Sequence, residues 1–247
     1  VVYAVIVALP TPFAVTYGGK KLVKNTDYTV SYSKNTAIGQ ASVKITGKGL
    51  YKGTKTVNFN IRPATVTKLK VSSTGEKSVK LSWKKITGAD SYAIYRYDNT
   101  SKKWHRIKTV KAVSFTDSGL ARAKGYSYKV KAVKKSGGKE YISASYSKAV
   151  EAVTKPAKAS CTAKSSGSGS IEVSWKAVGG ASGYEIYSSS NGSDYVKSAK
   201  VGGSQKSAIV SGFEPYSLRM VKVRAYKTVN GKTSYGAFSQ AVMVIVK

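Results

Sequence analysis

The stretch "SVKLSWKKITGADSYAIYRY" at residues 78–97 decides the fold, because it returns as "SIEVSWKAVGGASGYEIYSS" at residues 170–189. Nine of the twenty aligned positions are identical, and the offset is 92 residues. Later pieces return in the same order: "YKVKAVKK" is answered by "VKVRAYK", and "SYSKAV" by "AFSQAV". Self-similarity at a fixed offset indicates that one structural unit is repeated. The sequence therefore predicts two modules, at 63–154 and 155–247, preceded by a segment of another kind at 1–62.

The joints between these modules are marked by proline. Pro63 stands in "IRPATV" and Pro156 in "TKPAKA". Proline has no amide hydrogen to donate, so it ends strand pairing. No serine- or glycine-rich stretch surrounds either proline, and we therefore expect very short linkers and modules that meet end to end.

Inside each repeat, apolar and polar residues alternate with a period of two. In "SVKLSWKK", Val79, Leu81 and Trp83 share one face, while lysine and serine share the other. This alternation is typical of strands, and clusters such as "TGAD" and "KKSGGKE" mark turns between them. No segment has a convincing helical pattern. The sequence predicts an all-β protein built from two-sheet sandwiches, with Trp83 and its counterpart Trp175 in the cores.

The two repeats resemble fibronectin type III domains. The resemblance rests on the tryptophan of the second strand, on the third strands "GADSYAIYRY" and "GASGYEIYSS", and on a sixth strand "YSYKVKAV". In that family a leucine precedes a corner tyrosine by six residues, which implies this role for Leu120 and Tyr126. The later repeat departs from the pattern, with Phe213 and Arg219 at the two places.

The first segment resembles the short immunoglobulin-like repeats of Gram-positive surface proteins. The resemblance rests on "NTDYTVSYSKNTAIGQASVKITGKGLYKGTKTVNFNI", whereas residues 1–19 match that pattern poorly. The apolar start "VVYAVIVALP" is too short to cross a membrane, so we expect a strand there and no transmembrane segment. Together the resemblances imply three β-sandwich modules in tandem, one Ig-like and two of the fibronectin type III kind.

Positive charge is spread over the whole chain. Lysine and arginine total 42 against 11 acidic residues, a net charge of +31. The three segments carry +8 (9 basic, 1 acidic), +14 (20 and 6) and +9 (13 and 4). Only six of the basic residues are arginines, and lysine lacks the planar fork that reads bases. We expect loose attraction to polyanions, such as cell-wall polymers, and no specific recognition of nucleic acid.

No catalytic, metal or cofactor site is predicted. Nucleophilic catalysis usually needs a histidine base, and the single histidine, His105, lies in the hydrophilic stretch "SKKWHRIK". One histidine and one cysteine, Cys161, cannot supply the three or four ligands of a zinc site. We expect His105 on the surface and Cys161 as a small buried residue of a strand. The aspartates Asp90, Asp98 and Asp117 fall in stretches that indicate turns, and so does Asp194.

One candidate ligand face remains. Tyr95 and Tyr97 alternate with the expected core positions of their strand, and Trp104 follows shortly afterwards among lysines. Flat aromatic rings beside lysines could stack a sugar. The alternative is that these rings cover lysine stems and stabilise an exposed sheet, and this alternative is favoured.

The sequence thus favours a non-catalytic, extracellular spacer and display segment of a bacterial surface or secreted protein, monomeric in isolation. One alternative is a module that binds glycans or cell-wall polymers. Another is an accessory segment of a secreted glycan-degrading or proteolytic enzyme.

Overall fold

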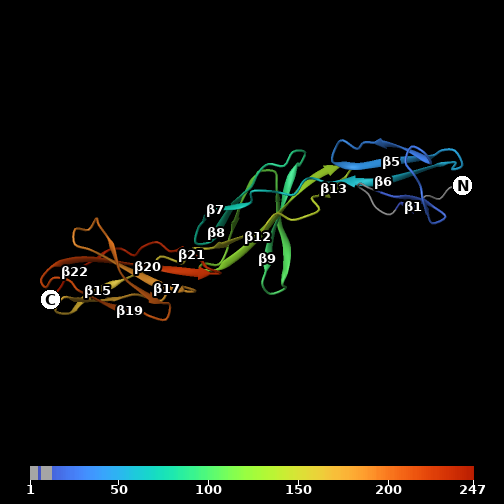
Figure 1. The fold of residues 1–247 in the computed structure, drawn as a ribbon. Helices are drawn as coiled ribbons and strands as arrows, with labels where there is room; N and C mark the ends of the chain where they lie inside the picture. Colours follow the sequence, from blue (N-terminus) through green and yellow to red (C-terminus); the bar gives the residue numbers. More distant parts are fainter. Residues whose placement is uncertain (1–4, 7–12) are drawn as a thin grey trace.

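The computed structural model describes residues 5–6 and 13–247, and this part of the chain contains β-strands and no helix. The all-β class predicted from the sequence is confirmed. The strands form three groups in a row, with the two termini at opposite ends (Figure 1). Each group has its own cluster of buried apolar side chains. Among the described residues, nothing forms an apolar helix of the length that a membrane crossing requires.

The N-terminal group holds two three-stranded antiparallel sheets, ordered β1-β2-β3 and β4-β5-β6. A small core of Val15, Leu22, Tyr28, Val43 and Ile45 joins them. The strand order within residues 1–19, which the sequence left open, falls partly on residues 1–4 and 7–12, outside the described part. The strands are β1 (Val5–Ile6), β2 (Val15–Tyr17), β3 (Lys20–Lys21), β4 (Tyr28–Ser33), β5 (Gly39–Gly47) and β6 (Thr54–Ile61).

The middle group is a sandwich of a three-stranded sheet, ordered β11-β8-β7, and a larger sheet, ordered β10-β9-β12-β13 with β14 paired to β12. All the pairs are antiparallel. This is the two-sheet arrangement that the resemblance to fibronectin type III domains implies. The strands are β7 (Lys70–Thr74), β8 (Ser78–Ser82), β9 (Ser91–Asp98), β10 (Lys103–Val110), β11 (Ser114–Ser118), β12 (Gly125–Ser136), β13 (Lys139–Ile142) and β14 (Val150–Val153).

The C-terminal group repeats this order strand for strand. Its sheets are β15-β16-β19 and β18-β17-β20-β21, with β22 paired to β20. The repeat in the sequence is therefore a repeat of one fold. The strands are β15 (Thr162–Gly167), β16 (Ser170–Ser174), β17 (Gly183–Ser189), β18 (Val196–Gly202), β19 (Ser207–Ser211), β20 (Leu218–Val229), β21 (Lys232–Tyr235) and β22 (Val242–Ile245).

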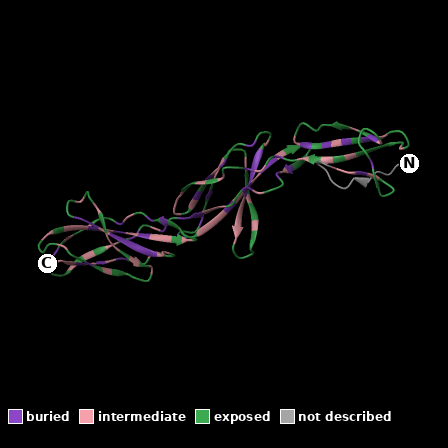
Figure 2. Cartoon of the chain, viewed as in Figure 1, coloured by how far each residue is buried: buried purple, intermediate pink, exposed green. Residues whose placement is uncertain are grey.

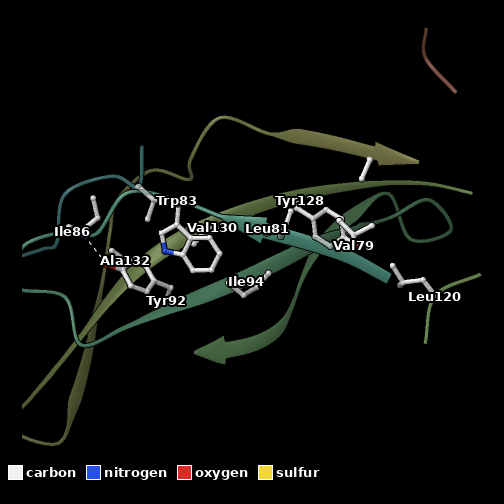
Figure 3. Packing of buried hydrophobic residues seen from close by; sticks show 12 residues of the cluster. Val79, Leu81, Trp83, Ile86, Tyr92, Ile94, Leu120, Tyr128, Val130 and Ala132 are labelled. Carbon is white, nitrogen blue, oxygen red and sulfur yellow. Dashed lines mark hydrogen bonds between the residues drawn. The ribbon is translucent and has the colours of Figure 1, made fainter. Parts of the chain in front are cut away.

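The duplicated stretch supplies the centre of each core. Trp83 lies against Tyr92 with ring centroids 5.3 Å apart, and the Tyr92 hydroxyl accepts the Ile86 amide hydrogen at 2.8 Å (Figure 3). The equivalent pair, Trp175 and Tyr184, has centroids 5.1 Å apart. Buried and exposed positions alternate along many of the strands, and the loop tips are mostly exposed (Figure 2). Period-two patterning thus places the tryptophans between the sheets, where burial of apolar area stabilises the sandwich.

The corner predicted from Leu120 and Tyr126 is present in the middle group. Leu120 is buried, and the Tyr126 hydroxyl accepts the Ala121 amide hydrogen at 2.9 Å. In the C-terminal group the departure from the family pattern changes the chemistry. The Arg219 guanidinium lies over the Phe213 ring, 5.0 Å from its centroid. A cation–π contact therefore stands where the other repeat has a hydrogen bond.

Candidate functional site

The predicted ligand face lies on the outer side of the larger sheet in the middle group. Tyr97 and Trp104 are opposite each other on β9 and β10, with ring centroids 5.2 Å apart. Tyr95 is opposite Lys129 on β12, and its ring meets Tyr146 edge to face at 4.9 Å. All of these side chains are half-buried. The structure therefore brings the three predicted residues onto one face and adds Tyr146 to them.

Lysine ammonium groups lie over two of these rings, those of Trp104 and Tyr146. The Lys129 ammonium lies 4.5 Å from the Trp104 centroid and 5.4 Å from the Tyr146 centroid. The Lys131 ammonium lies 4.2 Å from the Tyr146 centroid. We call Tyr95, Tyr97, Trp104, Lys129, Lys131 and Tyr146 the aromatic–cation face. A sugar that stacked on this face would have to displace a favourable cation–π contact, which favours the stabilising role over ligand binding.

The C-terminal group carries part of the same arrangement. Tyr187 meets Phe238 edge to face at 5.0 Å, as Tyr95 meets Tyr146. Lys222 is opposite Tyr187, and the Lys222 ammonium lies 4.5 Å from the Phe238 centroid. Sequence reasoning missed Tyr146 and Phe238, although the paired stretches "SYSKAV" and "AFSQAV" place them at equivalent positions. Both repeats therefore keep the edge-to-face pair and its lysine, whereas the Tyr97–Trp104 pair belongs to the middle group alone, because Ser189 stands at the place of Tyr97.

A buried carboxylate in the middle group corrects one prediction. The assignment of Asp117 to a turn is wrong: it lies in β11 and is buried. Its Oδ2 accepts hydrogen bonds from Arg96 Nη1 at 2.7 Å and from the Tyr128 hydroxyl at 2.8 Å. Burial, and then the hydrogen bond to Asp117, raises the pKa of Tyr128. Asp117 thus joins the two sheets through paired polar groups, which buried charges require.

The C-terminal group holds its own buried carboxylate, Glu185, which the sequence did not single out. Its Oε2 accepts from Arg224 Nη2 at 2.7 Å, and its Oε1 lies 3.4 Å from the Lys197 ammonium. Burial alone would raise the pKa of Glu185, but the hydrogen bonds and charges of Arg224 and then Lys197 hold that pKa below its ordinary value. The carboxylate is a charged link between strands β17, β18 and β20.

The single histidine does not form a catalytic set. His105 is exposed, and its Nε2 lies 2.9 Å from Ser101 Oγ and 3.9 Å from Asp98 Oδ2. In a hydrolytic triad, the carboxylate accepts a hydrogen bond from one imidazole nitrogen, and the serine hydroxyl donates to the other imidazole nitrogen. Here Ser101 donates directly to Asp98. The hydrogen bond from Ser101, followed by that from the Thr100 amide, lowers the pKa of Asp98 to about 2. These contacts belong to a hairpin turn.

The cysteine and the remaining aspartates are further candidate metal ligands. Over residues 5–6 and 13–247, no three histidine, cysteine or acidic side chains gather closely enough to hold a metal ion. Cys161 is half-buried beside the C-terminal core, just before β15, with its Sγ 3.1 Å from Ser239 Oγ. Of the other aspartates, Asp194 binds within its own turn, whereas Asp90 binds residues 44 and 45 positions away in the sequence. Asp90 accepts from the Lys135 amide, and Asp194 accepts from the Asn191 side chain.

Part of the chain is similar in sequence to part of a known enzyme. No family model matches the sequence. A poly(3-hydroxybutyrate) depolymerase from Ralstonia pickettii is 42% identical over 97 residues, which are 39% of this chain and 18% of that enzyme. The chain thus matches less than a fifth of that enzyme's length, a stretch about as long as one repeat.

Two solved chicken structures match most of the chain at low similarity. The FN1–FN3 domains of CNTN1 are 17% identical, with a TM-score of 0.39, and the match covers 84% of this chain and 77% of that one. A two-domain fibronectin type III segment of tenascin is 19% identical, with a TM-score of 0.44, and the match covers 76% of this chain and 99% of that one. At such identities the likeness concerns fold alone.

Proposed function

We propose that this chain is a non-catalytic spacer of a modular extracellular bacterial protein. Its modules would be residues 1–62, of the Gram-positive Ig-like kind, and the fibronectin type III-like repeats 63–154 and 155–247. The observation that carries the proposal is that both joints are tied by contacts from either side while the three groups stay in an extended row (Figure 1). A spacer must keep its two ends far apart. Contacts that hold the joints prevent the modules from folding back on one another.

The first joint is held on several sides. Pro63 is buried, and Arg62 donates to the Ile142 carbonyl at 3.2 Å. Gly88 lies so close to Ile38 that a Cβ at Gly88 would stand 2.8 Å from the Ile38 Cδ1 atom. A hinge would need free backbone on both sides of the proline. The contacts of Arg62 and Ile38 oppose that freedom.

The second joint is held by the backbone as well as by side chains. Pro156 is buried, the Lys155 amide donates to the Gly75 carbonyl at 2.9 Å, and the Lys155 carbonyl accepts from the Ala123 amide at 3.3 Å. Across the joint, Asn230 donates to Glu151 at 3.3 Å. The middle repeat thus fixes the linker in place, and the hydrogen bond from Asn230 to Glu151 ties the two repeats to each other.

The depolymerase relative supports an accessory role as a second candidate. The shared stretch is a minor part of that enzyme, as expected of a module carried beside a catalytic domain. In this form, the chain would hold a secreted enzyme at a distance from the surface that carries it.

Small-angle X-ray scattering on the isolated chain tests the spacer. A row of three modules should give a radius of gyration of about 28–30 Å, whereas one compact body of this length would give about 18 Å. Inserting a Gly-Ser linker after Lys155 is the control, since it should broaden the distribution of distances. A wild-type value near the compact limit would contradict the spacer. So would a distribution that the linker leaves unchanged.

A further inference from the structure

A groove at the second joint has the features of a binding site. Two adjoining cavities of about 390 and 350 Å³ share five lining residues, so they form one continuous groove. Each lies within the size range of small-ligand sites, roughly 300–1,000 Å³. The shared residues are Tyr97, Asn99, Lys124, Gly125 and Tyr126.

Two repeats build the walls of this groove. Lys227, Val229 and Asn230, around the end of β20, close the larger cavity from the C-terminal repeat. Gly125 permits the approach, because a Cβ at Gly125 would stand only 2.8 Å from the Val229 Cγ1 atom. The hydrogen bond from Asn230 to Glu151 holds the two sides together. The larger cavity therefore exists only while the joint keeps this geometry, whereas residues of the middle repeat alone line the smaller one.

The charges of the groove favour an anion. Lys124 and Lys227 line it and form no ion pair within residues 13–247. The acids beside them are engaged elsewhere: Asp98 accepts from Ser101 and the Thr100 amide, and Glu151 accepts from Asn230. These hydrogen bonds come from neutral groups and leave both carboxylates charged, but the larger cavity is lined by two lysines, Lys124 and Lys227, and by one acid, Glu151, so its lining keeps a net positive charge.

The remaining lining suits a sugar. The amides of Asn99 and Asn230, which line the larger cavity, offer donors and acceptors for hydroxyl groups. Recognition of a nucleic-acid base would need a free arginine fork, but Arg96, which lines the smaller cavity, is paired with Asp117. We propose that this groove binds an acidic oligosaccharide, with the Lys124 and Lys227 ammonium groups on its carboxylates and the Asn99 and Asn230 amides on its hydroxyl groups.

This site goes beyond the spacer role and does not rest on it, although both need the tied joint. Titration calorimetry on the full chain tests it, in low-salt buffer, with an α-1,4-linked galacturonic acid tetramer and its fully methyl-esterified form as probes. The tetramer should bind, and the uncharged ester should bind at least about tenfold more weakly, since it cannot make charge-assisted hydrogen bonds.

The matched variants remove equal charge at two places. Lys124→Gln with Lys227→Gln should weaken tetramer binding by about tenfold or more, because two charge-assisted contacts are lost. Lys84→Gln with Lys85→Gln, two exposed residues in the loop near the N-terminal group, should change it by less than about twofold at matched salt. Gly125→Val should push Val229 away and weaken binding without changing net charge.

Several outcomes would overturn the site. Equal losses in the two double-lysine variants would mean that the overall charge, and not the groove, attracts the tetramer. Equal affinity for tetramer and ester would remove the role of the carboxylates, and no binding of the tetramer at millimolar concentration would remove the site. Wild-type affinity in folded Gly125→Val would show that the two repeats do not form it together. Circular dichroism melts establish the folding of each variant.

Discussion

Trp83 and Trp175 occupy equivalent places but differ in one hydrogen bond. The Trp175 indole donates to the Gln205 carbonyl at 3.1 Å, whereas the buried Trp83 indole nitrogen has no partner in the part of the chain that the structure describes. A buried donor without a partner costs free energy relative to a satisfied one. The two tryptophans therefore pack in the same way, but only the Trp175 indole adds a hydrogen bond to the stability of its core.

Substitution of the tryptophans should separate packing from hydrogen bonding. Trp83→Ala or Trp175→Ala should lower the free energy of unfolding by about 3–5 kcal/mol, and half-buried Trp104→Ala by much less. Trp175→Phe should cost about 1 kcal/mol more than Trp83→Phe, because it leaves the Gln205 carbonyl unpaired. Urea unfolding measures all five. Equal small losses at the three tryptophans would contradict the sandwich cores, and equal phenylalanine values would contradict the hydrogen-bond difference.

Glu185 should give the C-terminal repeat an acid-sensitive stability. Its pKa in the folded chain lies below the ordinary value of 4.5, so its contribution is present above about pH 4.5 and disappears as the pH falls through the folded pKa. Glu185→Gln should lower stability at pH 7 by about 1–3 kcal/mol and flatten the loss of stability between pH 4.5 and 3. Urea midpoints at pH 7, 4.5 and 3 provide the measurement, with exposed Glu214→Gln as the control. An acid dependence unchanged by Glu185→Gln would exclude this role.

At the scale of the strand, alternation made the fold predictable and also set the limit of prediction. Period-two patterning in β8 and β12 indicated which residues enter the core. The repeat in the sequence indicated that the chain contains two copies of this sandwich. The pattern could not indicate Asp117, because an acid near serine and threonine suits a turn as well as a strand. Nor could it place Tyr146, which follows β13 and reaches the sheet only through the tertiary fold.

The aromatic–cation face should behave as a stabilising element. A double-mutant cycle with Tyr97→Ala and Trp104→Ala should give a coupling energy of about 0.5–1 kcal/mol, as expected of a cross-strand aromatic pair. Tyr95→Ala with Trp104→Ala is the matched control, because these rings are not opposite each other. Urea unfolding of the variants measures both couplings. Two results together would instead identify a ligand face. Tyr97 and Trp104 would show no coupling, and either substitution would abolish a tight, salt-independent binding of a neutral oligosaccharide.

At the scale of the whole molecule, a net charge of +31 with few arginines predicts attraction without selectivity. Binding to heparin, to an anionic cell-wall polymer or to DNA should weaken steeply between about 50 and 200 mM salt and should differ little among these polymers. Fluorescence anisotropy with labelled polymers tests this. The uncharged polymer dextran is the control. A strong preference for one polymer that persists at high salt would contradict this prediction.

The buried joints also bear on how such a lysine-rich chain survives among proteases. Enzymes that cut after lysine or arginine find many target bonds here, but each joint presents a basic residue followed by proline, Arg62–Pro63 and Lys155–Pro156, with the proline buried. A bond before proline is a poor substrate for such enzymes, and cleavage also needs backbone that can leave the fold, which exposed loop tips offer and these joints do not. Digestion should therefore begin at the loops, and the three units should stay linked after the first cuts.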